Sequence, residues 1–386
     1  MQSQIRIMHL VQRLNASGME NGVINICNNL DRGLFRPSVC TYEPEGTAEH
    51  RLDRSCVDIM CTRRYCGNDI SLPIRLARVL SQRKIDILHT HNWVTLMEGL
   101  VAAKIARVPV VIHGEHGHVR DRRRQIFAQR WAWRRVDRLL AVSDALADRM
   151  AGVVTFPRTN ITVIPNGVDA SKFIPKSSVT KDLRQKFGLP ESAFVVGMVA
   201  RFAGFKNHAG ALRAIQLLKQ RGSNAHIAMA GTGELEQELR RLAGSLQVTD
   251  RVHMVGEVAD IVPFLHCIDA LLSNSTHNEG MSNSILEAMA CEIAVIATRV
   301  AASSTVIENG VTGILIPPGD DTEVVNAISL LQDSPDCRTQ LGQAARQCIV
   351  ARFSVESMVQ AYAKIYESLF ALKRPSRAQR KSLSAS

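Results

Sequence analysis

Long apolar runs are missing from the 386-residue sequence, and so are the marks of secretion and of metal binding. No apolar stretch reaches the length that a helix needs to span a bilayer. The first residues lack the charged start and apolar core of a signal peptide. The nine cysteines and the histidines show no zinc-binding spacing, so we interpret the cysteines as free thiols of a reducing compartment. These absences together predict a cytoplasmic protein.

Motifs for nucleic-acid binding are missing too, although the chain is basic. We find no helix-turn-helix, zinc finger or aromatic sheet motif, so we expect no nucleic-acid partner. The net charge is +11, and much of the excess lies between Arg120 and Arg138, where arginines alternate with Phe127, Trp131 and Trp133. A basic helix with aromatic residues fits an anionic membrane surface, here the cytoplasmic face of the inner membrane. A solvated helix face is the alternative.

The length and the 46% hydrophobic content fit two globular domains. Strand-like apolar runs alternate with helical patterns, which predicts α/β domains with parallel sheets and right-handed crossovers. The turn at Pro165-Asn166-Gly167 interrupts this alternation. We therefore expect four segments: a first domain over 1–170, a second over 171–354, a helix over 355–372, and a disordered basic tail over 373–386.

A polar stretch, residues 276–290, lies between two apolar runs that read as buried strands. Gly280 allows a close turn, and Ser282 is a suitable N-cap for a short helix. The carboxyl end of a strand beside a helix N-terminus is an anion-binding place. Glu279 precedes this helix and Glu287 lies within it. Either glutamate alone would be read as a solvated side chain.

The two glutamates together resemble a known family, the retaining nucleotide-sugar glycosyltransferases of the GT-B fold. The hallmark of that family is a pair of glutamates separated by seven residues, which here stands as Glu279-Gly280 and Glu287-Ala288-Met289-Ala290. The resemblance implies two Rossmann-like domains that face a central cleft, with a last helix that crosses back to the first domain. It also implies transfer of a sugar from a nucleoside-diphosphate sugar, with UDP or GDP, to a saccharide or lipid-linked acceptor.

The resemblance also assigns roles to residues of the second domain. Arg201 and Lys206, after a predicted strand over 194–200, would hold the donor diphosphate, because fixed cations stabilise the charge that a leaving diphosphate gathers. Glu287 would accept hydrogen bonds from the ribose, and Glu279 would hold sugar hydroxyls near the reacting centre. The remaining expected donor contacts are the amides of Gly280, Met281 and Ser282, and the glycine turn with Gly231 and Gly233.

In the first domain, histidines follow two consecutive predicted strands, over 85–89 and over 108–112. Ligands bind at such strand ends, although a single histidine there is more often structural. In the resembled family a histidine after the second of these strands contacts the donor sugar. His116 is our first candidate for that contact and His113 the second. The expected donor-binding set of the first domain is completed by two turn residues, Gly18 and Asn166.

The chain departs from the family pattern where four glycines are usual, and it has Ser17, Glu292, Ala301 and Ala302 instead. These changes leave two alternatives open: a nucleotide-sugar epimerase or hydrolase, and a catalytically weak nucleotide-sugar-binding protein. Since no metal-binding D-x-D appears, the resemblance implies a metal-independent reaction without a cofactor, with attack on the same face as the leaving group. The segment Gly114-Glu115-His116-Gly117 is similar to that of sugar transferases of exopolysaccharide synthesis.

Overall fold

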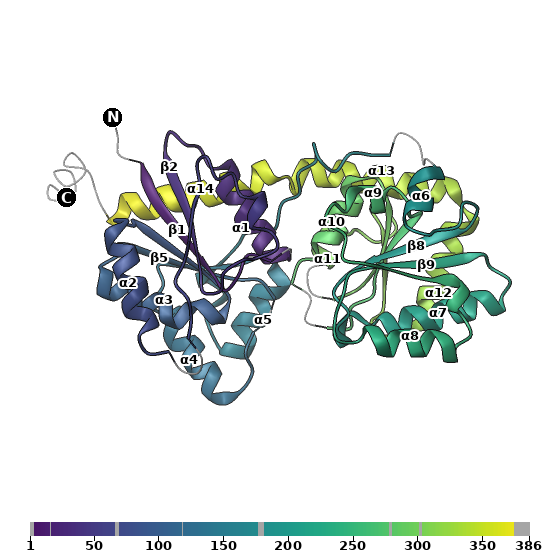
Figure 1. Cartoon of the computed structure of the whole chain (residues 1–386), viewed down its shortest axis with the longest axis horizontal. Coiled ribbons are helices and arrows are strands. Elements are labelled where there is room, and N and C mark those ends of the chain that lie inside the picture. The colour runs from purple at the N-terminus through teal and green to yellow at the C-terminus, as the bar shows by residue number, and fades with distance from the viewer. Residues whose placement is uncertain are drawn as a thin grey trace. The chain divides into compact units, whose positions relative to one another are not determined.

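The computed structural model describes residues 4–15, 17–65, 69–117, 119–176, 181–277, 280–300 and 303–373. The chain forms two compact units, and each contains one parallel sheet (Figure 1). The first unit runs to Gly167 and includes the residues from Val355 onward, and the second unit is Val168–Ser354. No helix among the described residues is long and apolar enough to cross a membrane. The cysteines that the structure describes are free thiols.

The sheet of the first unit has the strand order β3-β2-β1-β4-β5-β6-β7. All of its neighbouring strands pair in parallel. The order reverses at β1, which lies between β2 and β4, and ligands of open parallel sheets bind beyond the carboxyl ends at such a point. The strands are β1 Ile5–Val11, β2 Phe35–Thr41, β3 Asp58–Cys61, β4 Ile87–His91, β5 Val110–Glu115, β6 Arg138–Ala141 and β7 Ile161–Val163.

The last helix of the chain, α14, belongs to the first unit, so the expected crossing of the C-terminal helix is confirmed. Its apolar stripe packs on strand residues such as Ile7 and Ile112. This burial holds the helix to the sheet, because removing apolar surface from water contributes about 25 cal/mol per Å². The helices of the unit are α1 Gly18–Asn29, α2 Leu72–Gln82, α3 Trp93–Ala106, α4 Arg123–Trp133, α5 Asp144–Val154 and α14 Val355–Lys373, with short 3-10 turns η1 Glu49–Arg51 and η2 Arg158–Asn160.

The boundaries of three elements differ from the prediction in ways that affect the site. Helix α1 begins at Gly18, which the sequence analysis placed in a turn. Strands β4 and β5 run two or three residues beyond their predicted ends, to His91 and Glu115. The polar side chains that were predicted to follow these strands are buried strand residues, and hydrogen bonds among them satisfy several of their buried polar atoms.

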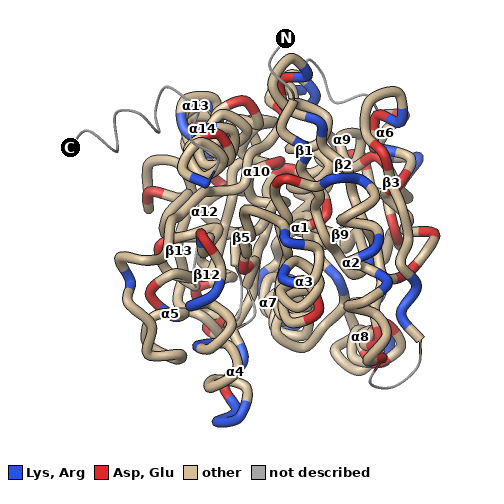
Figure 2. Tube along the Cα trace, turned by 90° about the vertical axis from the view of Figure 1, so that its left-hand side faces the viewer, with Lys and Arg blue, Asp and Glu red and all other residues tan. Residues whose placement is uncertain are grey.

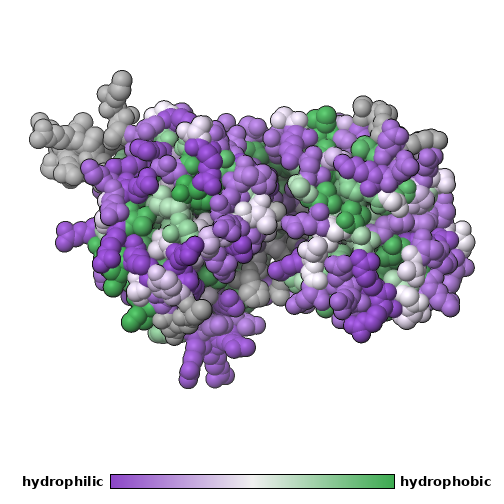
Figure 3. Space-filling view, in the orientation of Figure 1, coloured by the Kyte–Doolittle hydropathy of each residue, from purple (hydrophilic) through white to green (hydrophobic). Residues whose placement is uncertain are grey.

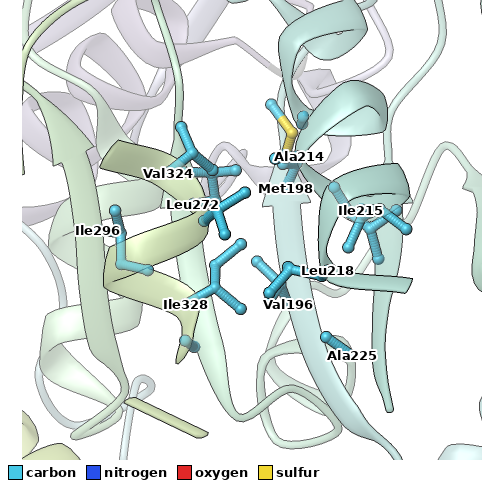
Figure 4. Close-up of a cluster of buried hydrophobic side chains, with 14 of the residues drawn as sticks. Val196, Met198, Ala214, Ile215, Leu218, Ala225, Leu272, Ile296, Val324 and Ile328 are labelled. Carbon is cyan, nitrogen blue, oxygen red and sulfur yellow. The ribbon is translucent and has the colours of Figure 1, made fainter. Parts of the chain in front are cut away.

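The sheet of the second unit has the order β10-β9-β8-β11-β12-β13 and reverses at β8. Val196 and Met198 of β8 and Leu272 of β11 pack with Ile215 of α7 and Ile328 of α12 in its core (Figure 4). The strands are β8 Phe194–Val199, β9 Ala225–Ala230, β10 Val252–Gly256, β11 Ala270–Ser273, β12 Ala294–Thr298 and β13 Ile314–Ile316. The helices are α6 Lys181–Lys186, α7 His208–Gln220, α8 Glu236–Ser245, α9 Val262–Leu265, α10 Asn283–Ala290, α11 Ser303–Val306, α12 Asp321–Asp333 and α13 Pro335–Arg352, with 3-10 turns η3 Gly204–Lys206 and η4 Thr249–Arg251.

A buried ion pair joins α6 to the sheet of the second unit. Arg184 donates to Asp269 Oδ2 at 2.7 Å, and the same oxygen accepts from the Val195 amide at 2.8 Å. The guanidinium also donates to the carbonyls of Cys267 and Ala193. Removing one member of a buried pair leaves an uncompensated charge, which is more costly than the pair itself is stabilising.

We therefore expect Asp269→Ala to destabilise the second unit by about 3–5 kcal/mol. The measurement is chemical denaturation followed by circular dichroism. The matched control is Asp250→Ala, which removes the more exposed pair of Asp250 with Lys219 and should cost at most about 1 kcal/mol. Equal losses in the two variants would show that burial of the Arg184 pair does not matter.

Candidate functional site

The loops after β8 and β9 are in backbone contact beside Arg201. Gly231 has a φ of +141°, and a Cβ there would collide with the carbonyl oxygen of Ala200. A Cβ at Gly233 would lie 2.5 Å from the carbonyl oxygen of Phe202, whose amide donates to the Thr232 carbonyl at 2.9 Å. The two glycines are therefore required for this close approach. They hold the loop of exposed Arg201 at the carboxyl ends of both strands.

The loop after β11 is fastened to the 3-10 turn that carries Lys206. The Thr276 amide donates to the Phe205 carbonyl at 2.8 Å. The side chain of Asn274 donates to the Asn207 carbonyl at 3.1 Å. These bonds bring the chain that leads into α10 beside the chain that carries Lys206.

The start of α10 has the expected N-cap residue but not the expected cap bond. Ser282 is the N-cap with an extended backbone, φ −79° and ψ 113°. Its hydroxyl bonds the Ser284 hydroxyl at 2.9 Å. Gly280 and Met281 are buried, and Glu287 is half-buried in the second turn of the helix. The other predicted acid, Glu279, lies outside the described residues, so its place stays a prediction.

The second unit thus gathers its described candidates at one edge of its sheet, the carboxyl ends of β8, β9 and β11 where the strand order reverses. Two basic side chains and the positive end of a helix macrodipole occupy that edge. Such an arrangement suits a diphosphate, because cations and helix amides both favour negative charge. The described candidates at this edge are Arg201, Lys206, Gly231, Gly233, Gly280, Met281, Ser282 and Glu287.

In the first unit a group of imidazoles, the histidine cluster, occupies the corresponding edge. Strand register brings these residues together: His9 is paired with His89, and His91 is paired with Gly114. A Cβ at Gly114 would lie 3.3 Å from His116 Nε2 and 3.4 Å from His89 Nε2, so glycine leaves room for the rings. The histidine cluster consists of His9, His89, His91, His113 and His116.

The rings of the histidine cluster bond one another and their neighbours. Nδ1 of His9 and Nε2 of His91 are 3.0 Å apart, and Nδ1 of His91 is 3.0 Å from Nε2 of His116. Nδ1 of His89 is 2.9 Å from the hydroxyl of Tyr366 in α14. Both nitrogens of His113 are engaged, at 2.8 Å to Thr90 Oγ1 and at 3.0 Å to Glu115 Oε1. His113 would have to break one of these bonds to hold a ligand, whereas His116 ends its chain.

Burial makes four rings of the histidine cluster poor bases. Desolvation lowers the pKa of His9 from 6.5 to about 3, and desolvation with His113 nearby lowers the pKa of His116 to about 3. The pKa values of His89 and His91 are lowered well below 6.5 by burial and by the neighbouring imidazoles. These four imidazoles are therefore neutral near pH 7, and each carries one N–H.

The sequence missed the parts of this network that come from outside the two histidine-rich strand ends. His9 lies within an apolar strand, and Tyr366 was interpreted only as part of an apolar helix stripe. The alternation of β1 was a usable signal, since His9 shares a face with buried Ile7 and Val11. Nothing in the sequence paired Tyr366 with His89, because 277 residues separate them.

The two remaining candidates of the first unit lie at other turns. Gly18 is the first residue of α1, and Ser17 before it has a φ of −126°, a conformation that does not require glycine. Asn166 is 8% exposed, and the next amide, of Gly167, donates to Met358 Sδ at 3.2 Å.

Of the departures from the family pattern in the second unit, Glu292 has a left-handed φ of 59°, which favours glycine. The other departures, Ala301 and Ala302, lie outside the described residues.

Helix α4 presents only part of the predicted basic and aromatic face. Phe127 is 72% exposed and Trp131 is 38% exposed, and the Arg135 guanidinium lies 3.8 Å above the Trp131 ring. Trp133 is 1% exposed and packs edge-on against Phe156, so its inclusion in this surface was wrong. Lys and Arg gather at the start of α4 (Figure 2), where hydrophilic side chains cover the surface (Figure 3).

Comparison with known proteins identifies the family. Residues 179–348 match the family described as Glycosyl transferases group 1, and residues 16–172 match Glycosyltransferase Family 4. The chain is a glycosyltransferase. It is 27% identical over 371 residues to the UDP-Gal:alpha-D-GlcNAc-diphosphoundecaprenol alpha-1,3-galactosyltransferase of Escherichia coli, covering 88% of this chain and 92% of that protein. It is also 27% identical over 311 residues to the N-acetyl-alpha-D-glucosaminyl L-malate synthase of Bacillus anthracis, covering 78% and 80%.

Solved structures confirm the fold of this glycosyltransferase. The crystal structure of HepE of Anabaena in complex with UDP-glucose superposes with a TM-score of 0.84 at 23% identity, covering 95% of this chain and all of that one. A glycosyltransferase of Rickettsia africae superposes with a TM-score of 0.83 at 20% identity, covering 95% and 98%. The predicted GT-B fold with two parallel α/β domains is therefore correct.

The neutral state of the histidine cluster predicts how the stability of this glycosyltransferase depends on pH. A histidine whose pKa is depressed in the folded state takes up a proton on unfolding, so its stabilising effect is present above pH 6.5 and is lost as pH falls from 6.5 towards 3. Within this range, each such ring raises the unfolding equilibrium constant by up to about tenfold for each pH unit by which the pH falls. We expect His9→Asn to reduce by about one the proton uptake on unfolding between pH 6 and pH 4.

The measurement is the slope of the logarithm of the unfolding equilibrium constant against pH, for the wild type and for His9→Asn. Comparing the two slopes cancels the contribution of the carboxylates. An unchanged slope would contradict a neutral His9 in the folded state.

The close contact of the two glycine-rich loops predicts an effect on nucleotide binding. Gly233→Ala forces Phe202 and the neighbouring Arg201 to move, so we expect UDP or GDP to bind about tenfold more weakly, with a stability loss of about 1–3 kcal/mol. Isothermal titration measures the affinity. Gly244→Ala, at a helix position where a Cβ meets nothing within 4 Å, is the control and should bind as the wild type does. Equal affinities in the two variants would contradict the role of the loop.

Proposed function

We propose that this glycosyltransferase moves a sugar, with retention of configuration, from a UDP- or GDP-sugar to a saccharide or lipid-linked acceptor in exopolysaccharide or cell-surface glycan synthesis. The observation that carries the proposal is the convergence of Arg201, Lys206 and the start of α10 at one sheet edge. The named acceptor of the Escherichia coli relative, a diphosphoundecaprenol-linked sugar, supports a lipid-linked acceptor. The malate named in the Bacillus anthracis relative indicates that acceptors differ among proteins of this similarity.

The proposed mechanism uses fixed positive charge in place of a metal. As the glycosidic bond breaks, the leaving diphosphate gathers negative charge, which Arg201 and Lys206 stabilise together with the amides of Gly280, Met281 and Ser282. The helix end contributes about 0.3–1 kcal/mol of this attraction. The acceptor attacks the face that the diphosphate leaves, and the leaving phosphate takes the acceptor proton.

The remaining candidates bind the rest of the donor in this proposal. The Glu287 carboxylate accepts from the ribose hydroxyls, which a planar carboxylate can take two at a time. Glu279 holds hydroxyls of the transferred sugar. His116 contacts that sugar through Nδ1, which has no hydrogen-bond partner among the described residues, while Gly18, Asn166, Gly231 and Gly233 allow the backbone to come close to the substrates.

Loss of either cation tests this mechanism. Arg201→Met and Lys206→Met should each lower kcat/KM for sugar transfer by about 10²–10³-fold, because each removes a positive charge that stabilises the developing negative charge of the diphosphate. The assay follows the glycosylated product with UDP- and GDP-sugars and a diphosphoundecaprenol-linked acceptor. Arg240→Met, which removes an exposed arginine of α8 paired with Glu236, is the control and should change little.

Three results would contradict the proposal: wild-type rates in both variants, nucleotide release that does not require an acceptor, or nucleotide binding without turnover. The second would indicate a hydrolase, and the third a binding protein.

The membrane surface is a separate part of the proposal. The exposed arginines at the start of α4 and the exposed ring of Phe127 would bind anionic headgroups, each basic residue contributing about 1 kcal/mol near the surface. We expect the triple change of Arg122, Arg123 and Arg124 to Glu to abolish co-sedimentation with phosphatidylglycerol vesicles. The change of Arg240 and Arg241 to Glu, on α8, should leave it intact. A wild-type protein that does not bind these vesicles would refute the attachment.

A further inference from the structure

Three rings of the histidine cluster form a linear chain, His9–His91–His116. The central ring uses both nitrogens, Nε2 towards His9 Nδ1 and Nδ1 towards His116 Nε2, each at 3.0 Å. One nitrogen is left over at each end, His9 Nε2 and His116 Nδ1, and neither has a hydrogen-bond partner among the described residues. The chain therefore has one ring nitrogen left over at each end, and the positions of its protons decide which of the two nitrogens is a donor.

Counting protons leaves two patterns for this chain. Three neutral rings carry three N–H groups, and each of the two links uses one of them. In the first pattern His9 Nδ1–H donates to His91, and His91 Nδ1–H donates to His116, which leaves His116 with a free Nδ1–H donor. In the second pattern every bond is reversed, so that His9 has a free Nε2–H and His116 Nδ1 is a bare acceptor. The tautomer of His116 is thus coupled to that of His9 through His91.

Burial distinguishes the two patterns. His9 is 0% exposed and lies among His89, His91 and Tyr366, whereas His116 lies after the end of β5 in a ring that is half-buried as a whole, although its Nδ1 atom is itself buried. The second pattern leaves an N–H without an acceptor at the deepest ring, and orphaned buried N–H groups are the rarer and costlier defect. The first pattern leaves only a lone pair there and places the N–H at His116 Nδ1, beyond the strand end, where it too has no acceptor among the described residues and a sugar hydroxyl can supply one.

We propose that His9 and His91 are positioning residues that hold His116 in the tautomer with its proton on Nδ1, so that His116 presents a hydrogen-bond donor to a hydroxyl of the transferred sugar. The inference rests on the proposed function for that last step alone. The tautomer itself depends only on the three rings. The Asn92 side chain supports the geometry, because its Oδ1 accepts from the His116 amide at 3.1 Å.

A metal ion is the competing explanation for the leftover nitrogens. His9, His89 and His91 each offer a ring nitrogen, and the three nitrogens lie within 4.8 Å of one another. Both nitrogens of His91 are already used in the chain, however. Three neutral imidazoles would also leave a divalent charge uncompensated in the core, since the carboxylate of the cluster, Glu115, already bonds His113. The hydrogen-bonded chain satisfies the same rings without this cost.

The experiment is long-range ¹H–¹⁵N correlation spectroscopy of the full-length enzyme with ¹⁵N-labelled histidine rings, which distinguishes the two tautomers. We expect His116 to carry its proton on Nδ1 in the wild type. His9→Asn places an amide donor where His9 Nδ1–H was and should keep that tautomer. His9→Leu removes the donor, so a second population of His116 with its proton on Nε2 should appear, and kcat for transfer should fall by about tenfold, with His9→Asn restoring it.

An Nε2–H tautomer of His116 in the wild type overturns the inference, even if no variant folds. So does an unchanged tautomer in His9→Leu, and so does stoichiometric zinc in the purified protein with unprotonated nitrogens at His9 and His89. If the tautomers behave as expected while transfer is equal in all three proteins, the coupling of the rings stands and the sugar contact of His116 is refuted. If His9→Leu loses both the Nδ1–H tautomer and kcat while His9→Asn keeps both, the result supports the coupling of the rings and the sugar contact of His116.

Discussion

The contact between two loop backbones determines where positive charge stands in the second unit. Gly231 and Gly233 let the loop after β9 lie against the residues that flank Arg201, and no side chain could occupy either position without displacing a carbonyl. The bond from Thr276 to Phe205 then fastens the approach to α10 beside Lys206. These are backbone constraints, and they hold the chain that carries Arg201 and Lys206, whereas the Arg201 side chain itself is exposed. A backbone that is already in place reduces the reorganisation needed when the leaving group becomes charged.

The corresponding sheet edge of the first unit contains buried imidazoles instead of cations. Its polar groups are neutral imidazoles in a dry environment, which can be satisfied only by bonding in chains. Strand register supplies the spacing, because His9, His89 and His91 come from two neighbouring parallel strands. Tyr366 adds one hydroxyl from α14, so the last helix contributes to the polar network as well as to the apolar core. The candidate site residues of the second unit thus include positively charged side chains, whereas those of the first unit are mainly neutral imidazoles.

Much of the fold was readable from the sequence because parallel strands and their helices have strong periodic patterns. The apolar patterns predicted a strand over 194–200 and a short helix after Ser282, which agree closely with β8 and α10. The ends of β4 and β5 were predicted too early because their polar side chains suggested a solvated strand end, whereas bonds between the two strand ends, such as Thr90–His113 and His91–His116, accompany their burial. Trp133 was misplaced for a similar reason, since its burial against Phe156 depends on tertiary packing. Glu292 takes up the left-handed conformation that a glycine would favour, which the composition alone could not show.

A crystal structure of the enzyme with UDP tests the central claim most directly. The account predicts that the diphosphate lies at the carboxyl edge of the second sheet, within hydrogen-bond distance of Arg201 and Lys206 and against the first amides of α10. A diphosphate bound at any other place on the second unit, or one held there without either cation, would contradict it.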